Sequence, residues 1–145
     1  MTDRQKRNDV VLAVVRVVLG VVFVMHGWQK YDTITIDGVE SMFDGMGVPF
    51  PYAAAVGVTM LELAGGVALV LGVLTRPLAV LFALNMAGAV YFAHWESGFY
   101  VNEGGYELVL VLGVVSAMFA AIGGGRYSVD RWLENGRTRV SSMTG

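Results

Sequence analysis

The stretch VVRVVLGVVFVMHGWQK, residues 14–30, places a single arginine, Arg16, inside an otherwise unbroken apolar run. With the apolar residues just before it, the run reaches from about residue 10 to residue 26, close to the roughly 20 residues that a membrane-spanning helix needs. It lacks the small-residue cleavage pattern of a secretory signal, so we expect it to be kept as a membrane helix. An arginine inside such a helix requires a partner elsewhere in the chain.

The overall composition excludes an ordinary soluble domain. The chain has 145 residues, of which 55% are hydrophobic and 15% are charged, whereas soluble domains average roughly 45–50% apolar and about 25% charged residues. It has no cysteine, which excludes a disulfide, thiol exchange and a metal site built from thiolates. The length fits one unit, so we expect a single membrane domain over residues 1–145.

Four apolar segments have the length and composition of membrane-spanning helices. They cover about residues 10–26, 51–74, 77–94 and 105–122. The turn at residues 75–77 makes the second and third segments antiparallel neighbours, because short connections join adjacent helices. The sequence therefore predicts an all-α fold, an integral membrane four-helix bundle whose constant partner is the lipid bilayer.

The distribution of positive charge predicts the orientation of this bundle. Of the 10 Lys and Arg residues, Arg16 lies inside a span and only Lys30 lies in an outer connection. The others flank the spans on the opposite side, namely Arg4, Lys6, Arg7, Arg76, Arg126, Arg131, Arg137 and Arg139. Because loops rich in Lys and Arg stay in the cytoplasm, we expect a multi-pass protein of the plasma (cell) membrane with both termini cytoplasmic. The basic cytoplasmic tail, residues 126–145, is then an orientation signal, and we expect no nucleic-acid partner.

The first outer connection, residues 28–50, is long enough to hold a short helix. An apolar face recurs there at the spacing of a helix, formed by Val39, Met42, Phe43 and Met46. Asp37 is a candidate cap at its start, and Gly47 with Pro49 would end it. We expect this amphipathic helix to lie at the outer interface or to fold over the mouth of the bundle; the alternative is an irregular loop with an apolar patch.

Three polar residues from three different spans fall at a similar depth. At about 1.5 Å per residue, Arg16, Glu62 and Asn85 lie roughly 9 to 14 Å from the cytoplasmic edge of the hydrocarbon core. A lone charge there costs at least about 2.5–3.5 kcal/mol, so we expect Arg16 to pair with Glu62 and Asn85 to bond to the pair. This intramembrane polar layer is either an ion pair that fixes helix register or the working group of a small-molecule or proton transporter.

A second polar cluster is expected at the outer ends of the spans. It comprises His26, Lys30, His94, Tyr106 and Glu107. Such residues either form the interfacial belt at helix ends or line a shared ligand-binding pocket in which histidines exchange protons near neutral pH. The two histidines also suggest haem ligands, but their place at the rim would leave a haem uncovered, so we do not expect haem. The ligand spacing of a zinc site is missing, and we expect no metal.

Four motifs, in a fixed order, carry a family resemblance. They are RVVLGVVFVMHGWQK at residues 16–30, LELAGGVALVLGVLTRP at 61–77, GGYE at 104–107 and GGGRYSVD at 123–130. Together they resemble the DoxX family over about residues 10–130. Gly124 is a departure, because a proline is common at that position in the family.

The resemblance implies a small four-helix membrane protein in a redox setting. Relatives act in archaeal quinone-linked sulfur oxidation, and some actinobacterial members are associated with tethering superoxide dismutase and a sulfurtransferase to the membrane. We therefore expect a membrane component of an oxidoreductase assembly that binds a quinone through His26, His94 and Glu107, tethers soluble redox enzymes, or does both. The expected partners are soluble or membrane oxidoreductase subunits and a second copy of the chain as a homo-oligomer. Whether the chain is itself an enzyme stays open.

Overall fold

Every regular element of the computed structural model, which describes residues 2–141, is helical. The first helix, α1 (Asp3–Trp28), continues into a π-helical turn, η1 (Gln29–Ile34), and is followed by α2 (Ile36–Gly45). A second rod consists of α3 (Pro51–Met60), the π-helical turn η2 (Leu61–Gly65) and α4 (Gly66–Leu71). The remaining elements are α5 (Thr75–Ala89), η3 (Val90–His94), η4 (Trp95–Ser97), η5 (Val101–Glu103), α6 (Glu107–Ile122) and α7 (Val129–Ser141). The predicted all-α fold is confirmed.

Three helical stretches within residues 2–141 are long and apolar enough to cross a membrane. They are Asp3–Ile34, Pro51–Leu71 and Thr75–Ser97. The segment expected as a fourth span, residues 105–122, contains the shorter apolar helix α6. Pro51 stands in the first turn of its stretch, where the missing N–H has no partner to lose.

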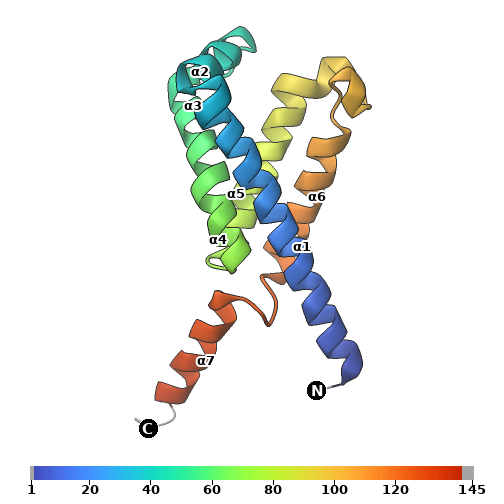
Figure 1. The fold of residues 1–145 in the computed structure, drawn as a ribbon, viewed down its shortest axis with the longest axis vertical. Coiled ribbons are helices and arrows are strands. Elements are labelled where there is room, and N and C mark those ends of the chain that lie inside the picture. The colour runs from blue at the N-terminus through green and yellow to red at the C-terminus, as the bar shows by residue number, and fades with distance from the viewer. Residues whose placement is uncertain (1, 142–145) are drawn as a thin grey trace.

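The helices form two groups that separate toward the end of the molecule carrying α2 (Figure 1). α1 packs on α4 and η2, whereas α5 packs mainly on α6. The two groups meet in an apolar core, where the rings of Phe23 and Phe82 stack with their centroids 3.8 Å apart. Leu69 and Phe119 belong to the same core and are fully buried.

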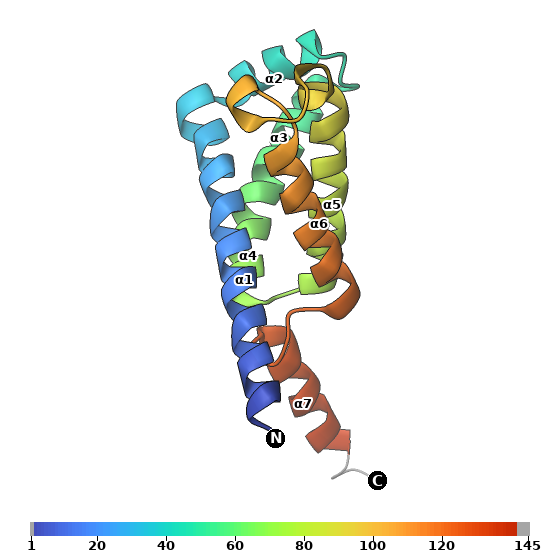
Figure 2. The same cartoon turned by 90° about the vertical axis from the view of Figure 1, so that its right-hand side faces the viewer.

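The helix expected in the first outer connection is present as α2, which lies across the end of the bundle opposite the two termini (Figure 2). Val39 is buried, at 2% exposure, as expected for its apolar face. The predicted cap is wrong: Thr35, not Asp37, is the N-cap, and its hydroxyl accepts the backbone N–H of Gly38 at 3.4 Å. Both residue types cap helices, and the chain turns into the helix two residues earlier than expected.

Some helix bounds differ from the expectation. α1 begins at Asp3 rather than near residue 10, because Thr2 and Gln5 form a capping box at its start. The second rod ends at Leu71, because Gly72 takes a left-handed conformation there. Part of the expected basic tail is the helix α7; residues 142–145 lie outside the described residues, as do the side chains of Arg137 and Arg139.

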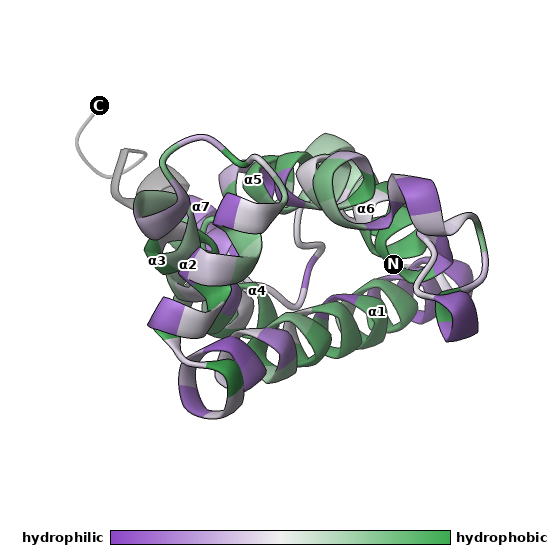
Figure 3. Ribbon diagram, turned by 90° about the horizontal axis from the view of Figure 1, so that it is seen from above, coloured by the Kyte–Doolittle hydropathy of each residue, from purple (hydrophilic) through white to green (hydrophobic). Residues whose placement is uncertain are grey.

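Apolar and polar residues are segregated along the bundle. Seen from the α2 end, the long helices are mostly apolar, and hydrophilic stretches gather in the connections and at helix ends (Figure 3). The N-terminus, the turn between α4 and α5, and the segment after α6 lie at one end, away from α2 (Figures 1 and 2). The sequence assigned this basic end to the cytoplasm, and that orientation stays a prediction.

Candidate functional site

A cavity of about 590 Å³ lies between the two helix groups and beneath α2. All the long helical stretches contribute to it, and α2 covers it with Met42, Phe43 and Met46. Its buried apolar lining includes Phe23, Met86 and Leu112. The apolar face of α2 thus turns toward the cavity, although Met42 is still 48% exposed.

A buried polar group lies in this apolar cavity. Glu62 is 3% exposed, and one of its carboxylate oxygens accepts a hydrogen bond from Lys30 Nζ at 2.7 Å. The other oxygen accepts a hydrogen bond from the Asn85 amide at 3.4 Å. The carboxylate is therefore neutralised by one ion pair and held on both oxygens. We call Lys30, Glu62 and Asn85 the polar triad.

π-Helical turns present three of the polar residues that line the cavity. Lys30 lies in η1, Glu62 in η2 and His94 in η3. A π-helical turn widens the helix by one residue, and such turns are frequent at functional sites. No sequence pattern used above predicts a π-helical turn, so these three irregularities were missed.

The expected outer cluster is only partly brought together. His26, Lys30 and His94 line the cavity, but Tyr106 and Glu107 do not. The Tyr106 ring stacks on Trp95 instead, at 5.9 Å between centroids, and the backbone N–H of Glu107 bonds to the Phe99 carbonyl. These two residues start α6 and close the preceding loop, which holds them away from the cavity. Within residues 2–141, no group of three or more His, Cys, Asp and Glu residues is placed to hold a metal ion.

The expected pairing of Arg16 with Glu62 is wrong. Arg16 is buried, at 2% exposure, and its guanidinium donates to the carbonyls of Leu69 at 2.7 Å, Val70 at 2.6 Å and Tyr127 at 2.7 Å. Arg16 lies level with the end of α4, about two helical turns from Glu62 along that rod. The last carbonyls of a helix have no partner inside it, and the guanidinium satisfies them. Lys30, which lies in η1 beyond the other end of α1, pairs with Glu62 instead.

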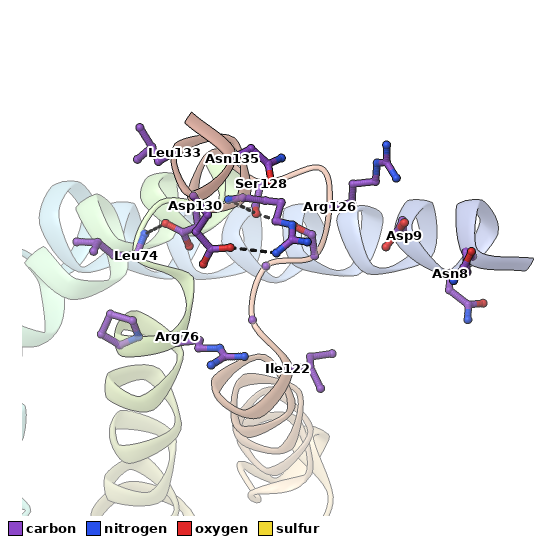
Figure 4. Close-up of a pocket in the computed structure, with 17 residues that line it drawn as sticks. Asn8, Asp9, Leu74, Arg76, Ile122, Arg126, Ser128, Asp130, Leu133 and Asn135 are labelled. Atoms are coloured by element: carbon purple, nitrogen blue, oxygen red, sulfur yellow. Dashed lines mark hydrogen bonds and ion pairs between the residues drawn. The ribbon is translucent and has the colours of Figure 1, made fainter. Parts of the chain in front are cut away.

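The motif GGGRYSVD at residues 123–130 closes the opposite end of the bundle (Figure 4). The Asp130 carboxylate accepts the backbone N–H groups of Leu74 and Thr75, each at 2.8 Å, and so caps the start of α5. The Ser128 hydroxyl donates to the Gly125 carbonyl at 2.7 Å. A larger cavity of about 1280 Å³, lined mostly by polar residues, lies between this segment, α1 and α7. The motif therefore joins α1, α4, α5 and α7, which is an architectural role.

Gly124, where a proline is common in the family that the sequence resembles, is closely surrounded by other atoms in this chain. A Cβ atom built on Gly124 would lie 2.6 Å from Thr75 Oγ1 and 2.9 Å from Ser128 Cβ. Such distances are too short for ordinary packing, so the segment passes Thr75 more closely than a residue with a Cβ allows.

Comparisons with known proteins agree with the motifs. The DoxX family model matches residues 11–95, more than half of the chain. A Haemophilus influenzae protein named "Uncharacterized protein" is 31% identical over 134 residues, which cover 90% of this chain and 96% of that protein. "Inner membrane protein YqjF" of Escherichia coli is 30% identical over 129 residues, covering 89% of this chain and 96% of that protein.

A third relative carries a redox name. "Putative oxidoreductase CatD" of Bacillus subtilis is 28% identical over 133 residues, covering 91% of this chain and 93% of that protein. No solved structure matches the chain. The long apolar helices and the inner-membrane relative identify a multi-pass protein of the inner (plasma) membrane. The chain belongs to the DoxX family of membrane proteins.

Proposed function

We propose that the protein is a membrane component of an oxidoreductase assembly and that it binds a quinone in the cavity beneath α2. The observation that carries this proposal is the buried polar triad inside an otherwise apolar cavity. A volume of about 590 Å³ falls within the roughly 300–1,000 Å³ typical of small-molecule sites, which are mostly apolar with a few placed polar groups. The redox name of the Bacillus subtilis relative supports the setting.

The donors and acceptors of the cavity fit both forms of a quinone headgroup. An ammonium has three N–H donors, and Lys30 uses one of them on Glu62, which leaves donors for a quinone carbonyl. The Asn85 amide retains its carbonyl oxygen as an acceptor for a quinol hydroxyl. His94 Nδ1 lies 2.7 Å from the Gly104 carbonyl, so Nδ1 carries the proton and Nε2 is an acceptor in the neutral ring.

The chemistry divides between the ligand and the chain. A bound quinone would accept two electrons and two protons, with the electrons supplied by a partner oxidoreductase. The chain's own residues would hold and orient the ring: the polar triad binds one edge, and the apolar walls exclude water from it. The buried charge pair keeps the site neutral overall, which suits an uncharged ring.

The transport alternative loses its basis in the geometry. It relied on one layer formed by Arg16, Glu62 and Asn85. Arg16 instead bonds to backbone carbonyls at the end of α4, whereas Glu62 and Asn85 bond to one another. We therefore retain ligand binding as the function of the triad and assign Arg16 an architectural role.

Recruitment of soluble redox enzymes is the second part of the proposal, and α7 supports it. This helix projects from the end of the bundle opposite α2 (Figure 1). Its Trp132 and Leu133 side chains are 73% and 50% exposed, so two apolar groups are available to a partner. Crosslinking in native membranes of the wild type and Trp132→Ala tests this part: the same partners at the same yield in both would refute it.

Equilibrium binding of decylubiquinone to the purified protein tests the ligand site. We expect saturable binding to the wild type and a loss of about tenfold in affinity in Asn85→Leu, which removes one hydrogen-bonding group of the triad. Glu107→Gln is the matched control, because Glu107 does not line the cavity, and it should bind like the wild type. No saturable binding to the wild type would refute the proposal.

A further inference from the structure

One stripe of α5 and η3 belongs both to the cavity and to the outer surface. Leu84, Gly88 and Phe92 all line the cavity, and their spacing of four residues puts them on one side of the helix. Leu84 is nevertheless 63% exposed and Phe92 37% exposed. A Cβ atom built on Gly88 would meet no other atom within 4 Å. The cavity wall is therefore interrupted along this stripe.

The facing wall comes from the other helix group. Ala54 and Val58 of α3 line the cavity and lead, again at intervals of four residues, to Glu62 at its polar end. α3 and α5 belong to the two groups that separate toward the α2 end (Figure 1). The interruption thus lies between two membrane-spanning stretches, where the surroundings are lipid and not water.

We propose that the cavity opens sideways into the bilayer between α3 and α5, and that its ligand is a long-tailed amphiphile which enters through this portal. The portal is lined by Ala54, Val58, Leu84, Gly88 and Phe92. This inference rests on the proposed ligand site and adds the route and the ligand class. The polar triad holds the headgroup, and the hydrocarbon tail leaves past Gly88 into the lipid.

The size and the lining of the cavity indicate that the hydrocarbon tail of the ligand lies outside it. A cavity of about 590 Å³ suits a ligand of drug-like size and is too small for a ring together with a full polyisoprenoid chain. The portal residues are all apolar or glycine, so a tail that passes between them stays in contact with hydrocarbon and exposes no apolar surface to water.

A pair of glycine substitutions tests the portal. Gly88→Trp places a large side chain in the opening, where a Cβ meets nothing within 4 Å. Gly57→Trp is the matched control: its Cβ also meets nothing within 4 Å, and Gly57 lies on α3 but does not line the cavity. The probes are decylubiquinone and the same ring without a tail, each titrated into the purified proteins in nanodiscs.

We expect Gly88→Trp to weaken decylubiquinone binding by about tenfold or more and to change binding of the tail-free ring much less. Gly57→Trp should bind both probes like the wild type. Equal decylubiquinone affinity in all three proteins would refute the portal while leaving the ligand site intact. If the wild type binds neither probe, the proposed ligand site fails and the portal fails with it.

Photocrosslinking of the wild type gives a second readout that does not depend on a variant. A decylubiquinone analogue with a photoreactive group on its tail should label peptides containing residues 54–58 and 84–92. Labelling confined to α1 and α6 would place the tail on the other side of the cavity and overturn the portal.

Discussion

At the scale of single residues, the Glu62 carboxylate is a buried charge whose cost must be offset. It is 3% exposed and lies in a membrane-spanning stretch, where an unpaired charge costs several kcal/mol. Lys30 and Asn85 offset that cost by occupying both carboxylate oxygens. Removing one member of a buried pair is therefore worse than replacing both with apolar groups.

A double-mutant cycle on Lys30 and Glu62 tests this energetic account. We expect Lys30→Met and Glu62→Leu each to lower the free energy of unfolding by about 3–5 kcal/mol, and the double variant to recover much of that loss. The same cycle on Arg131 and Glu134, an exposed pair with 58% and 66% of the side chains accessible, should give a coupling below about 1 kcal/mol. Additive losses at Lys30 and Glu62 would contradict the pairing.

Arg16 makes a separate prediction, because its partners are backbone carbonyls. Arg16→Leu removes the guanidinium donors to the carbonyls of Leu69, Val70 and Tyr127, of which Leu69 keeps only the Gly72 N–H. We expect a loss of about 3 kcal/mol or more in unfolding free energy. Combined with Glu62→Leu, the losses should add, since the two side chains share no hydrogen bond. A coupling above about 1 kcal/mol would show that the two charges interact after all.

At the scale of elements, the junction between α4 and α5 depends on a close approach. Gly72 ends α4 with φ +74, and a Cβ there would lie 2.5 Å from Ser128 Cβ and 2.7 Å from an Arg16 guanidinium nitrogen. The Asp130 carboxylate secures the next two residues, because its two oxygens accept the backbone N–H groups of Leu74 and Thr75. The end of one helix and the start of the next are thus fixed by the same segment.

The junction can be tested with two alanine substitutions that share a backbone conformation. Gly47 has φ +73 and its Cβ would meet nothing within 4 Å, so Gly47→Ala should cost only the left-handed strain of about 1 kcal/mol. Gly72→Ala adds the clash with Ser128 and Arg16, and we expect at least about 2 kcal/mol more. Thermal unfolding of both variants measures the difference in stability. Equal losses of stability in the two variants would show that the close approach of Gly72 to Ser128 and Arg16 does not contribute.

Sequence patterns predicted the elements better than they predicted the contacts between them. The apolar face of α2 was visible because Val39, Met42 and Phe43 follow the helical period. The three π-helical turns were not, because a one-residue widening leaves composition and periodicity almost unchanged. Depth counting also failed for Arg16. It placed Arg16 level with Glu62, whereas Arg16 lies level with Leu69 and Val70, because the alignment of two antiparallel helices does not follow from the bounds of their apolar runs.

At the scale of the whole molecule, composition alone predicted a membrane protein, and the long apolar helices agree with it. The short turn at residues 75–77 predicted that the second and third segments are neighbours, but α4 packs mainly on α1 and α5 mainly on α6. This grouping could not be predicted, because every span is apolar on most of its surface and no periodic stripe distinguishes one neighbour from another. The sequence predicted the residues of the candidate site as parts of two separate clusters. Lys30 was assigned to the outer cluster and Glu62 to the inner layer, and only the structure joins them.

Orientation is a prediction for the whole molecule, and the lack of cysteine makes it easy to test. Asn8→Cys and Gly45→Cys place single exposed thiols at opposite ends. With a membrane-impermeant maleimide on intact cells, Gly45→Cys should be labelled, and Asn8→Cys should be labelled only after the cells are permeabilised. The reverse pattern would place the basic end outside, against the distribution of Lys and Arg.

If the cavity beneath α2 holds a quinone headgroup against the polar triad, the bound ring should be visible there. The measurement is a crystal structure of the protein grown in lipid with decylubiquinone. We predict electron density for the ring inside the cavity, with an oxygen of the ring within hydrogen-bond distance of Lys30 Nζ or the Asn85 amide. Density for the ring elsewhere, or a cavity without density at saturating decylubiquinone, would contradict the claim.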